Sequence, residues 1–122
     1  MTRENLARAA VLSVANSLAD CLDILREAHV AVDRVLLIGG GARSEALCEV
    51  LPDTLGMPVT VPEAGEYVAL GAAQQAAWAA TEELPEWSRS VSRELFPAGD
   101  VGVQEFRRRY ALARQETQAQ LG

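Results

Sequence analysis

The sequence predicts an α/β fold, because helical and strand-like segments alternate along the chain. The run Val35-Leu36-Leu37-Ile38 is aliphatic throughout, which is typical of a strand buried within a parallel sheet. A β-branched run at residues 59–61 predicts a second strand. Amphipathic segments with helical spacing precede, separate and follow the two runs. The predicted order is helix, strand, helix, strand, helix, loop and C-terminal helix.

The first predicted helix spans residues 3–28, with Thr2 as its N-cap. Apolar residues recur along it at helical spacing, namely Leu6, Ala10, Val14, Leu18, Leu22 and Leu25. A second set widens this stripe, namely Val11, Leu12, Ala15 and Ala19. We therefore expect the helix to be covered on more than one side. His29 follows at the C-terminal end, where partial positive charge is favourable, so we expect it to be structural rather than catalytic.

The next two elements have clear ends. A second helix is predicted over residues 43–55, and it stops at Gly56 and Pro58. The predicted strand at 59–61 is ended by Pro62.

The remaining elements are an alanine-rich helix, a loop and a final helix. The alanine-rich helix spans 66–80, and Gly71 in its middle costs roughly 1 kcal/mol relative to alanine. We expect such a glycine where another backbone packs against the helix. The following loop contains one extended piece at 90–95, and Asp100 caps a last helix that runs to about residue 118. The apolar stripe of that helix is Val103, Phe106, Tyr110 and Ala113.

Two strands are too few for a strand as apolar as 35–38, which calls for neighbours on both edges and helices on both faces. The long first helix also needs a sheet to lie on. The chain therefore reads as the back half of a larger sheet domain.

Composition excludes several functions. The 122 residues carry a net charge of −6, which makes nucleic acid a poor partner. All 11 basic residues are arginine, so no mechanism that needs a lysine amine is available, and the arginine run 107–109 is expected to be a solvated helix face. Cys21 and Cys48 are expected to be small buried hydrophobes without a disulfide, and no Cys and His set suggests a metal site. With no long apolar run and no signal-peptide pattern, a cytoplasmic protein without membrane contact is expected.

Three consecutive glycines in "RVLLIGGGARSEAL" allow three interpretations. Gly39 and Gly41 fit two positions of the G-x-G-x-x-G dinucleotide fingerprint, and Glu63 lies where an acid would bind a ribose, but Ser44 replaces the third glycine. The glycines could instead only ease a tight strand-to-helix turn. The third interpretation is an adenosine site, in which a purine lies against bare backbone beside the N-terminus of a helix.

The motifs "IGGGARS", "LGMPVTVPEAGE" and "ALGAA", in this order and spacing, resemble the C-terminal domain of the FGGY carbohydrate kinases, most closely the xylulokinase branch. The helix before them and "ELFPAGDVGVQEFRRRYALARQ" after them also resemble that branch, so the likeness covers nearly the whole chain. It implies an incomplete actin-like, ribonuclease-H-like ATPase domain, with residues 1–122 forming the second half of the C-terminal domain.

The resemblance implies a full-length parent enzyme with two domains. ATP, in the form of Mg-ATP, is expected to bind in the cleft between them. The residues expected to form part of the adenosine site are Gly39, Gly40, Gly41, Ala42, Arg43, Ser44 and Glu45. Related kinases often have an amide at the position of Glu45, whereas an ionised carboxylate there accepts hydrogen bonds but donates none. Gly71 is expected to let its helix pack beneath the nucleotide loop. The family commonly has glycine in place of His29, and histidine tolerates the left-handed conformation better than most residues.

The resemblance also implies which parts lie outside these residues. The family's catalytic aspartate and its phosphate-binding loop belong to the first domain, and most sugar contacts are there too. Asp53, Glu63 and Glu66 form no evident acid–base couple and are expected to be solvated or capping, so no catalytic residue is assigned. The parent is expected to be an ATP-dependent kinase of a ketopentose such as D-xylulose, and the 122 residues are expected to be inactive alone.

Two kinds of partner are expected. The chain is expected to contact ATP or ADP itself, and the sugar only through the first domain. The uncovered edge of strand 35–38 predicts a homo-oligomer, with that strand pairing across a two-fold axis. A free-standing, non-enzymatic module that associates through this edge is the alternative to a kinase piece, and a dinucleotide-binding fragment is a third possibility.

Overall fold

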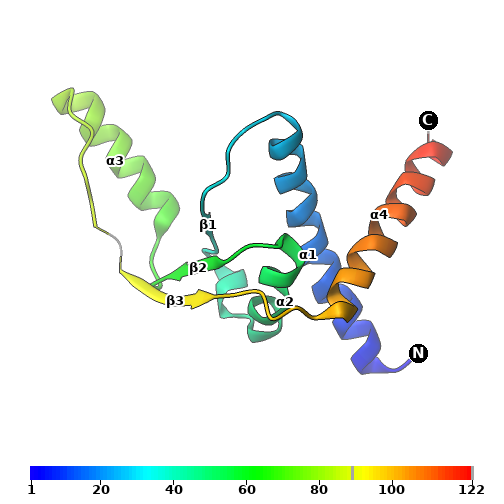
Figure 1. Ribbon diagram of the computed structural model, residues 1–122. Coiled ribbons are helices and arrows are strands. Elements are labelled where there is room, and N and C mark those ends of the chain that lie inside the picture. The colour runs from blue at the N-terminus through cyan, green and yellow to red at the C-terminus, as the bar shows by residue number, and fades with distance from the viewer. Residues whose placement is uncertain (89, 122) are drawn as a thin grey trace.

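A computed structural model describes residues 1–88 and 90–121. Over these residues, four α-helices, a short 3-10 helix and three strands follow one another (Figure 1). Their bounds are α1 Arg3–Glu27, β1 Val35–Leu36, η1 Gly40–Arg43, α2 Glu45–Leu55, β2 Val59–Pro62, α3 Tyr67–Thr81, β3 Val91–Leu95 and α4 Val101–Leu121. The predicted order is confirmed, and the extended piece at 90–95 is a third strand.

The strands form one sheet in the order β1-β2-β3. β1 pairs parallel to β2, with Val35 opposite Val59, and β3 pairs antiparallel to β2 on the other side. The prediction of a four-residue strand at 35–38 was wrong, because the ladder stops early. Leu37 N–H still donates to the Thr60 carbonyl (2.9 Å), but the next bond of a parallel ladder would need an N–H at Pro62, which has none.

α1 begins and ends with hydrogen-bonded caps. Thr2 Oγ1 accepts from Asn5 N–H (3.2 Å), as the sequence predicted. At the other end, His29 has φ 58°, in the left-handed region. Its N–H donates to the Arg26 carbonyl (2.9 Å), and Val30 N–H donates to the Leu25 carbonyl (2.9 Å), which is the pair of bonds of a Schellman motif. His29 therefore closes the helix, which confirms its structural role.

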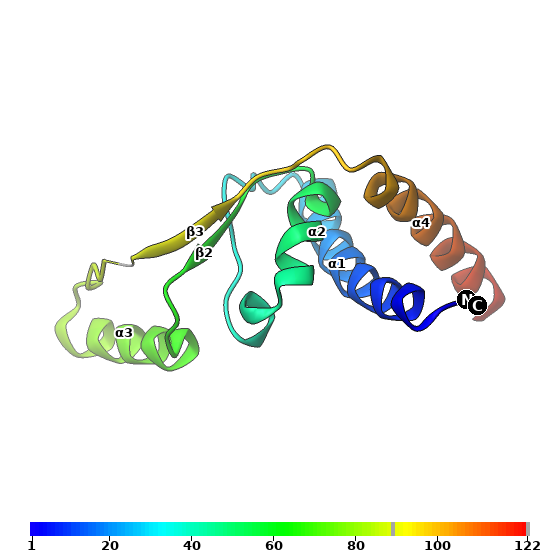
Figure 2. The same ribbon diagram turned by 90° about the horizontal axis from the view of Figure 1, so that it is seen from below.

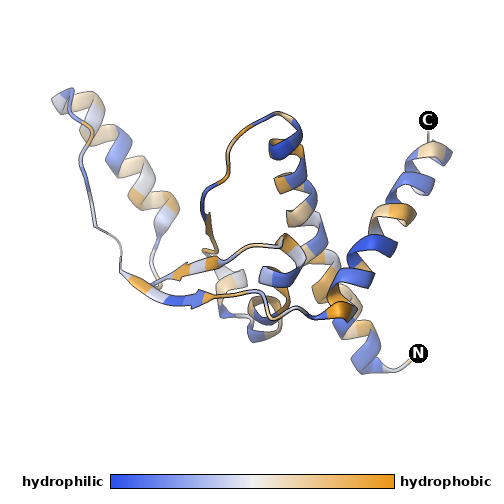
Figure 3. Cartoon of the chain, in the orientation of Figure 1, coloured by the Kyte–Doolittle hydropathy of each residue, from blue (hydrophilic) through white to orange (hydrophobic). Residues whose placement is uncertain are grey.

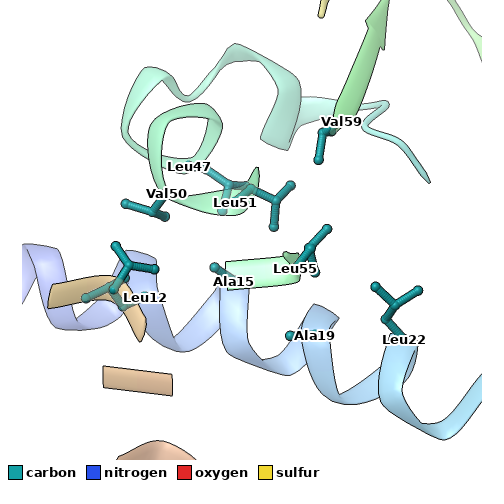
Figure 4. Packing of buried hydrophobic residues seen from close by; sticks show 10 residues of the cluster. Leu12, Ala15, Ala19, Leu22, Leu47, Val50, Leu51, Leu55 and Val59 are labelled. Atoms are coloured by element: carbon teal, nitrogen blue, oxygen red, sulfur yellow. The ribbon is translucent and has the colours of Figure 1, made fainter. Parts of the chain in front are cut away.

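The core lies between α1 and α2, beneath β2 (Figure 4). One face of α1 packs on one face of α2, and the labelled side chains are Leu12, Ala15, Ala19, Leu22, Leu47, Val50, Leu51, Leu55 and Val59. Gly56 ends α2 in the left-handed conformation, with φ 68°. Asp53 was expected to be solvated or capping, but it is buried and its Oδ1 accepts from Gly99 N–H (2.7 Å), which fixes the segment before α4.

The leading apolar stripe predicted for α1 is mostly not the buried one. Its members Leu6, Val14, Leu18 and Leu25 are exposed, whereas the second set supplies Leu12, Ala15 and Ala19 to the core. Figure 3 shows hydrophobic residues along β1 and on successive turns of α1. α2 and α4 both contact α1, but the exposed leading stripe has no cover, so the expected cover on more than one side is confirmed only in part. Cys21, expected to be buried, is exposed on this helix, whereas Cys48 is buried as predicted, and both thiols are free.

α4 is anchored to α1 by ion pairs. Asp100 caps it, because Oδ1 accepts from Gly102 N–H (2.8 Å). Arg107 donates to Asp20 Oδ1 (2.7 Å) and Asp23 Oδ2 (2.6 Å) on α1. Burial opposes the charge of Arg107, but the hydrogen bonds to the two carboxylates outweigh it and raise its pKa. The prediction of a solvated face at 107–109 was thus wrong for Arg107. Its ion pairs with α1 form because α4 packs against that helix.

α3 extends away from the rest of the molecule (Figures 1 and 2). None of its residues is buried, and a Cβ built at Gly71 meets no atom within 4 Å. The expected close packing at Gly71 is therefore wrong for this structure. Gln74 Nε2 donates to the Pro85 carbonyl (2.7 Å), which ties the returning segment to the helix. Within residues 1–88 and 90–121, no helix has the length and apolarity needed to cross a membrane.

Candidate functional site

A hollow of about 520 Å³ lies where the chain leaves β1 and β2. One wall is the end of the β1 segment and the glycine turn, and the opposite wall is the segment that follows β2. Ser92 and Arg93 of β3 complete it. The lining residues of the first two walls are Leu37, Ile38, Gly39, Gly40, Ala42, Arg43, Val61, Pro62, Glu63, Ala64, Gly65, Glu66 and Tyr67.

The three glycines meet three different requirements. Gly39 has φ 78° and ψ −159°, a region that is essentially reserved for glycine. A Cβ on Gly41 would lie 3.3 Å from Leu47 Cδ2, so this glycine allows α2 to pack closely. A Cβ on Gly40 would meet nothing within 4 Å, and Gly40 lines the hollow. Of the three glycines, Gly40 is the one for which neither backbone conformation nor packing of the described residues requires a glycine.

The turn is closed by short-range hydrogen bonds. Ala42 N–H donates to the Gly39 carbonyl (3.2 Å), and Ser44 N–H donates to the Gly41 carbonyl (3.1 Å). Ser44 Oγ then accepts from Leu47 N–H (3.3 Å), which makes it the N-cap of α2. The glycine turn and the helix start therefore form one bonded unit.

The predicted site residues fall into two groups. Gly39, Gly40, Ala42 and Arg43 line the hollow. The other three serve the turn and the helix: Gly41 packs on Leu47, Ser44 caps α2, and Glu45 pairs with Arg93.

Arg93 is a residue that the sequence reasoning missed. Its Nη1 donates to both carboxylate oxygens of Glu45 (3.1 and 2.9 Å). Its Nη2 lies 3.4 Å from the Ala42 carbonyl oxygen and 3.3 Å from Cys48 Sγ. The hydrogen bonds to Glu45, with the attraction of its charge, raise the pKa of Arg93. The available signal was the strand alternation, which puts Arg93 on the same side of β3 as the partly buried Leu95.

The hollow carries groups suited to binding rather than to proton transfer. Arg43 and Arg93 contribute positive charge, and Glu63 and Glu66 contribute negative charge. Glu63 is exposed, and Glu66 sits at the N-cap position of α3 without a side-chain cap bond. Among the described residues, no group of three or more His, Cys, Asp or Glu is arranged to hold a metal ion.

A glycine turn between a parallel strand and a helix, facing a hollow, is typical of α/β nucleotide-binding domains. Comparison with known proteins defines the family. Residues 1–80 match the family described as "FGGY family of carbohydrate kinases, C-terminal domain", and the chain belongs to this family.

Individual relatives agree with this assignment. The chain is 40% identical to the xylulose kinase of Haemophilus influenzae over 78 residues, which cover 64% of this chain and 16% of that protein. It is 32% identical to the glycerol kinase of Bordetella parapertussis over 113 residues, which cover 87% of this chain and 22% of that protein. The chain thus spans less than a quarter of either relative.

A solved structure confirms the fold. The crystal structure of xylulose kinase from Bifidobacterium adolescentis superimposes with a TM-score of 0.74 and 44% sequence identity, covering 93% of this chain and 22% of that one. The chain therefore has part of the actin-like, ribonuclease-H-like fold that the resemblance implied.

Proposed function

We propose that these residues form the adenosine-binding half of the C-terminal domain in an ATP-dependent sugar kinase. Gly40 is the observation that supports this most directly. It is bare backbone facing the hollow, and nothing within the chain requires a glycine there. A purine or ribose that approaches the main chain closely would require it. The volume of the hollow, about 520 Å³, falls within the range of small-molecule sites.

The substrate we propose is a ketopentose such as D-xylulose. The support is that the xylulose kinases of Streptomyces coelicolor (43%) and Bifidobacterium adolescentis (44%) are somewhat more identical to the chain than the compared glycerol kinases, which reach 40%. Phosphoryl transfer requires phosphates, Mg²⁺ and a nucleophile to be positioned together. The family's catalytic aspartate and sugar contacts belong to the first domain. We therefore propose that the 122 residues have no kinase activity alone, and that the binding site for Mg-ATP is completed in the full-length kinase.

An NMR titration of the chain with ADP tests the nucleotide site. We expect amide shifts at residues 39–45, with weak affinity because half of the cleft is involved. Gly40→Val places a branched side chain in the hollow and should abolish these shifts. Gly71→Val is the matched control, since Gly71 also has open space around it but lies on α3. Silence of the unmodified chain at 39–45, or a preference for NAD over ADP, would refute the proposal.

A second candidate, a self-associating module, is supported by one further feature. An apolar groove of about 360 Å³ lies between α1 and β1, and it is lined by Leu18, Cys21, Leu22, Leu25, Val35, Leu36, Leu37, Ile38, Leu51 and Leu55. In the described sheet, β1 pairs with β2 alone, so its other edge is free.

Sedimentation velocity over a wide concentration range tests this candidate. Self-association through the groove predicts a dimer that Leu36→Glu dissociates, because Leu36 is exposed at the free edge. Leu112→Glu is the control, since Leu112 is an exposed leucine on α4. A folded monomer at all concentrations would exclude the candidate.

A further inference from the structure

Arg93 connects three points around the glycine turn. It reaches from β3 to the first residue of α2 through Glu45, to the turn itself through the Ala42 carbonyl, and to the buried thiol of Cys48. Arg93 and Ala42 also line the hollow. One side chain therefore ties the turn, the adjoining helix and the third strand together at the edge of the hollow.

The Glu45 side of this ion pair is open to solvent, with the Glu45 side chain 80% exposed, but the pair joins two separate elements, unlike an ion pair within one helix. Arg108 and Glu105, three residues apart on α4, are joined by two hydrogen bonds, but they hold no other element. An exposed pair of that kind contributes little to stability. Arg93 and Glu45 are 48 residues apart in sequence, and their pairing fixes one segment against another.

The charge of Glu45 gives the pairing a second consequence. Glu45 is in the first turn of α2, where the helix N-terminus would otherwise favour an anion. An unpaired carboxylate there would repel a nucleotide, which carries several negative charges. The guanidinium donates to both Glu45 oxygens, and its positive charge offsets such a repulsion.

We propose that Arg93 is a positioning residue of the nucleotide site, which holds the glycine turn in its binding conformation and neutralises Glu45. This role rests on the proposed nucleotide-binding function. Arg93 acts through Ala42 and Glu45, so its loss should loosen the turn even in the absence of nucleotide.

The experiment has two readouts on the 122-residue chain. The first is hydrogen–deuterium exchange at amides 40–46 without ligand, and the second is ADP affinity by NMR titration. Arg93→Met keeps an apolar stem but removes every donor. We expect faster exchange at 40–46 and an ADP affinity lower on the order of tenfold, which corresponds to the loss of one charge-assisted hydrogen bond that holds the turn in its binding conformation. Arg108→Met removes a matched exposed arginine from α4, and both readouts should stay unchanged.

Two further variants separate geometry from charge. Arg93→Lys retains a positive charge beside Glu45 without the planar fork, so its ADP affinity should lie between those of the unmodified chain and Arg93→Met. Adding Glu45→Gln to Arg93→Met removes the unpaired charge. This should recover part of the affinity while exchange at 40–46 stays fast.

The outcomes separate the two proposals. If the unmodified chain gives no response to ADP, the nucleotide-binding function fails, and the role of Arg93 fails with it. If the unmodified chain binds ADP and Arg93→Met binds it equally well, only the role of Arg93 is overturned. The same holds if exchange at 40–46 in Arg93→Met equals that in the Arg108→Met control.

Discussion

Replacing the three glycines of the turn by alanine, one at a time, should change the free energy of unfolding by three different amounts. Gly39→Ala forces a side chain into a conformation with φ 78° and ψ −159°. Such a strain costs on the order of 1–3 kcal/mol. Gly40→Ala should change the free energy of unfolding by less than about 0.5 kcal/mol, because its Cβ meets nothing. Gly41→Ala should fall between them, since its Cβ would lie 3.3 Å from Leu47 Cδ2 and that side chain must shift.

Urea unfolding followed by circular dichroism measures these differences. With a dependence on urea of about 1 kcal/mol per molar, the midpoint for Gly39→Ala should fall by roughly 1–3 M. The midpoint for Gly40→Ala should be nearly that of the unmodified chain. If the two variants lose equal stability, the separate roles assigned to the glycines are wrong. Gly40→Ala supplies the functional contrast, because it should weaken ADP binding while leaving the fold intact.

Other substitutions test the core and the attachment of α4. Leu51→Ala should destabilise the chain by about 2–5 kcal/mol in the same urea assay, because Leu51 is 1% exposed between α1 and α2. Arg107→Met should cost about 1–2 kcal/mol, less than a fully buried pair because its side chain is 21% exposed, and should speed amide exchange in α4. The pKa of Glu105 is lowered to about 2, chiefly by hydrogen bonds from Arg108 and then Arg109. Because these side chains are exposed, the pairing adds only a small stability to α4 above the ordinary carboxyl pKa, and this is lost as pH falls towards 2. An NMR titration of the Glu105 carboxyl should give a midpoint near 2, and a midpoint near the ordinary carboxyl value of 4.5 would contradict the pairing.

Local signals in the sequence predicted the elements and their caps. Thr2 and Asp100 begin their helices as expected, because an N-cap depends on residues only a few positions away. His29 was identified as a helix end for the same reason. The turn at Gly39 to Arg43 was placed correctly between a strand and a helix, since glycines after an aliphatic run are a local signal.

Features that depend on distant partners were missed. The periodicity of α1 predicts an apolar stripe, but it does not show which side of the helix faces α2. Most of the leading stripe is in fact exposed. Arg107 lies in an arginine run that reads as solvated, yet it pairs with residues more than 80 positions earlier. Arg93 pairs with Glu45 across 48 positions. One sequence contains no pattern that brings such residues together.

Pro62 shows how one missing hydrogen can shape a binding surface. Without an N–H at this position, Pro62 cannot donate to the Leu37 carbonyl, and the parallel ladder ends there. The residues at and beyond this end line the hollow, with Leu37 to Gly40 on one side and Val61 to Glu63 on the other. The last residue of β2, an imino acid, thus coincides with the point where the pairing of β1 and β2 stops and the hollow begins.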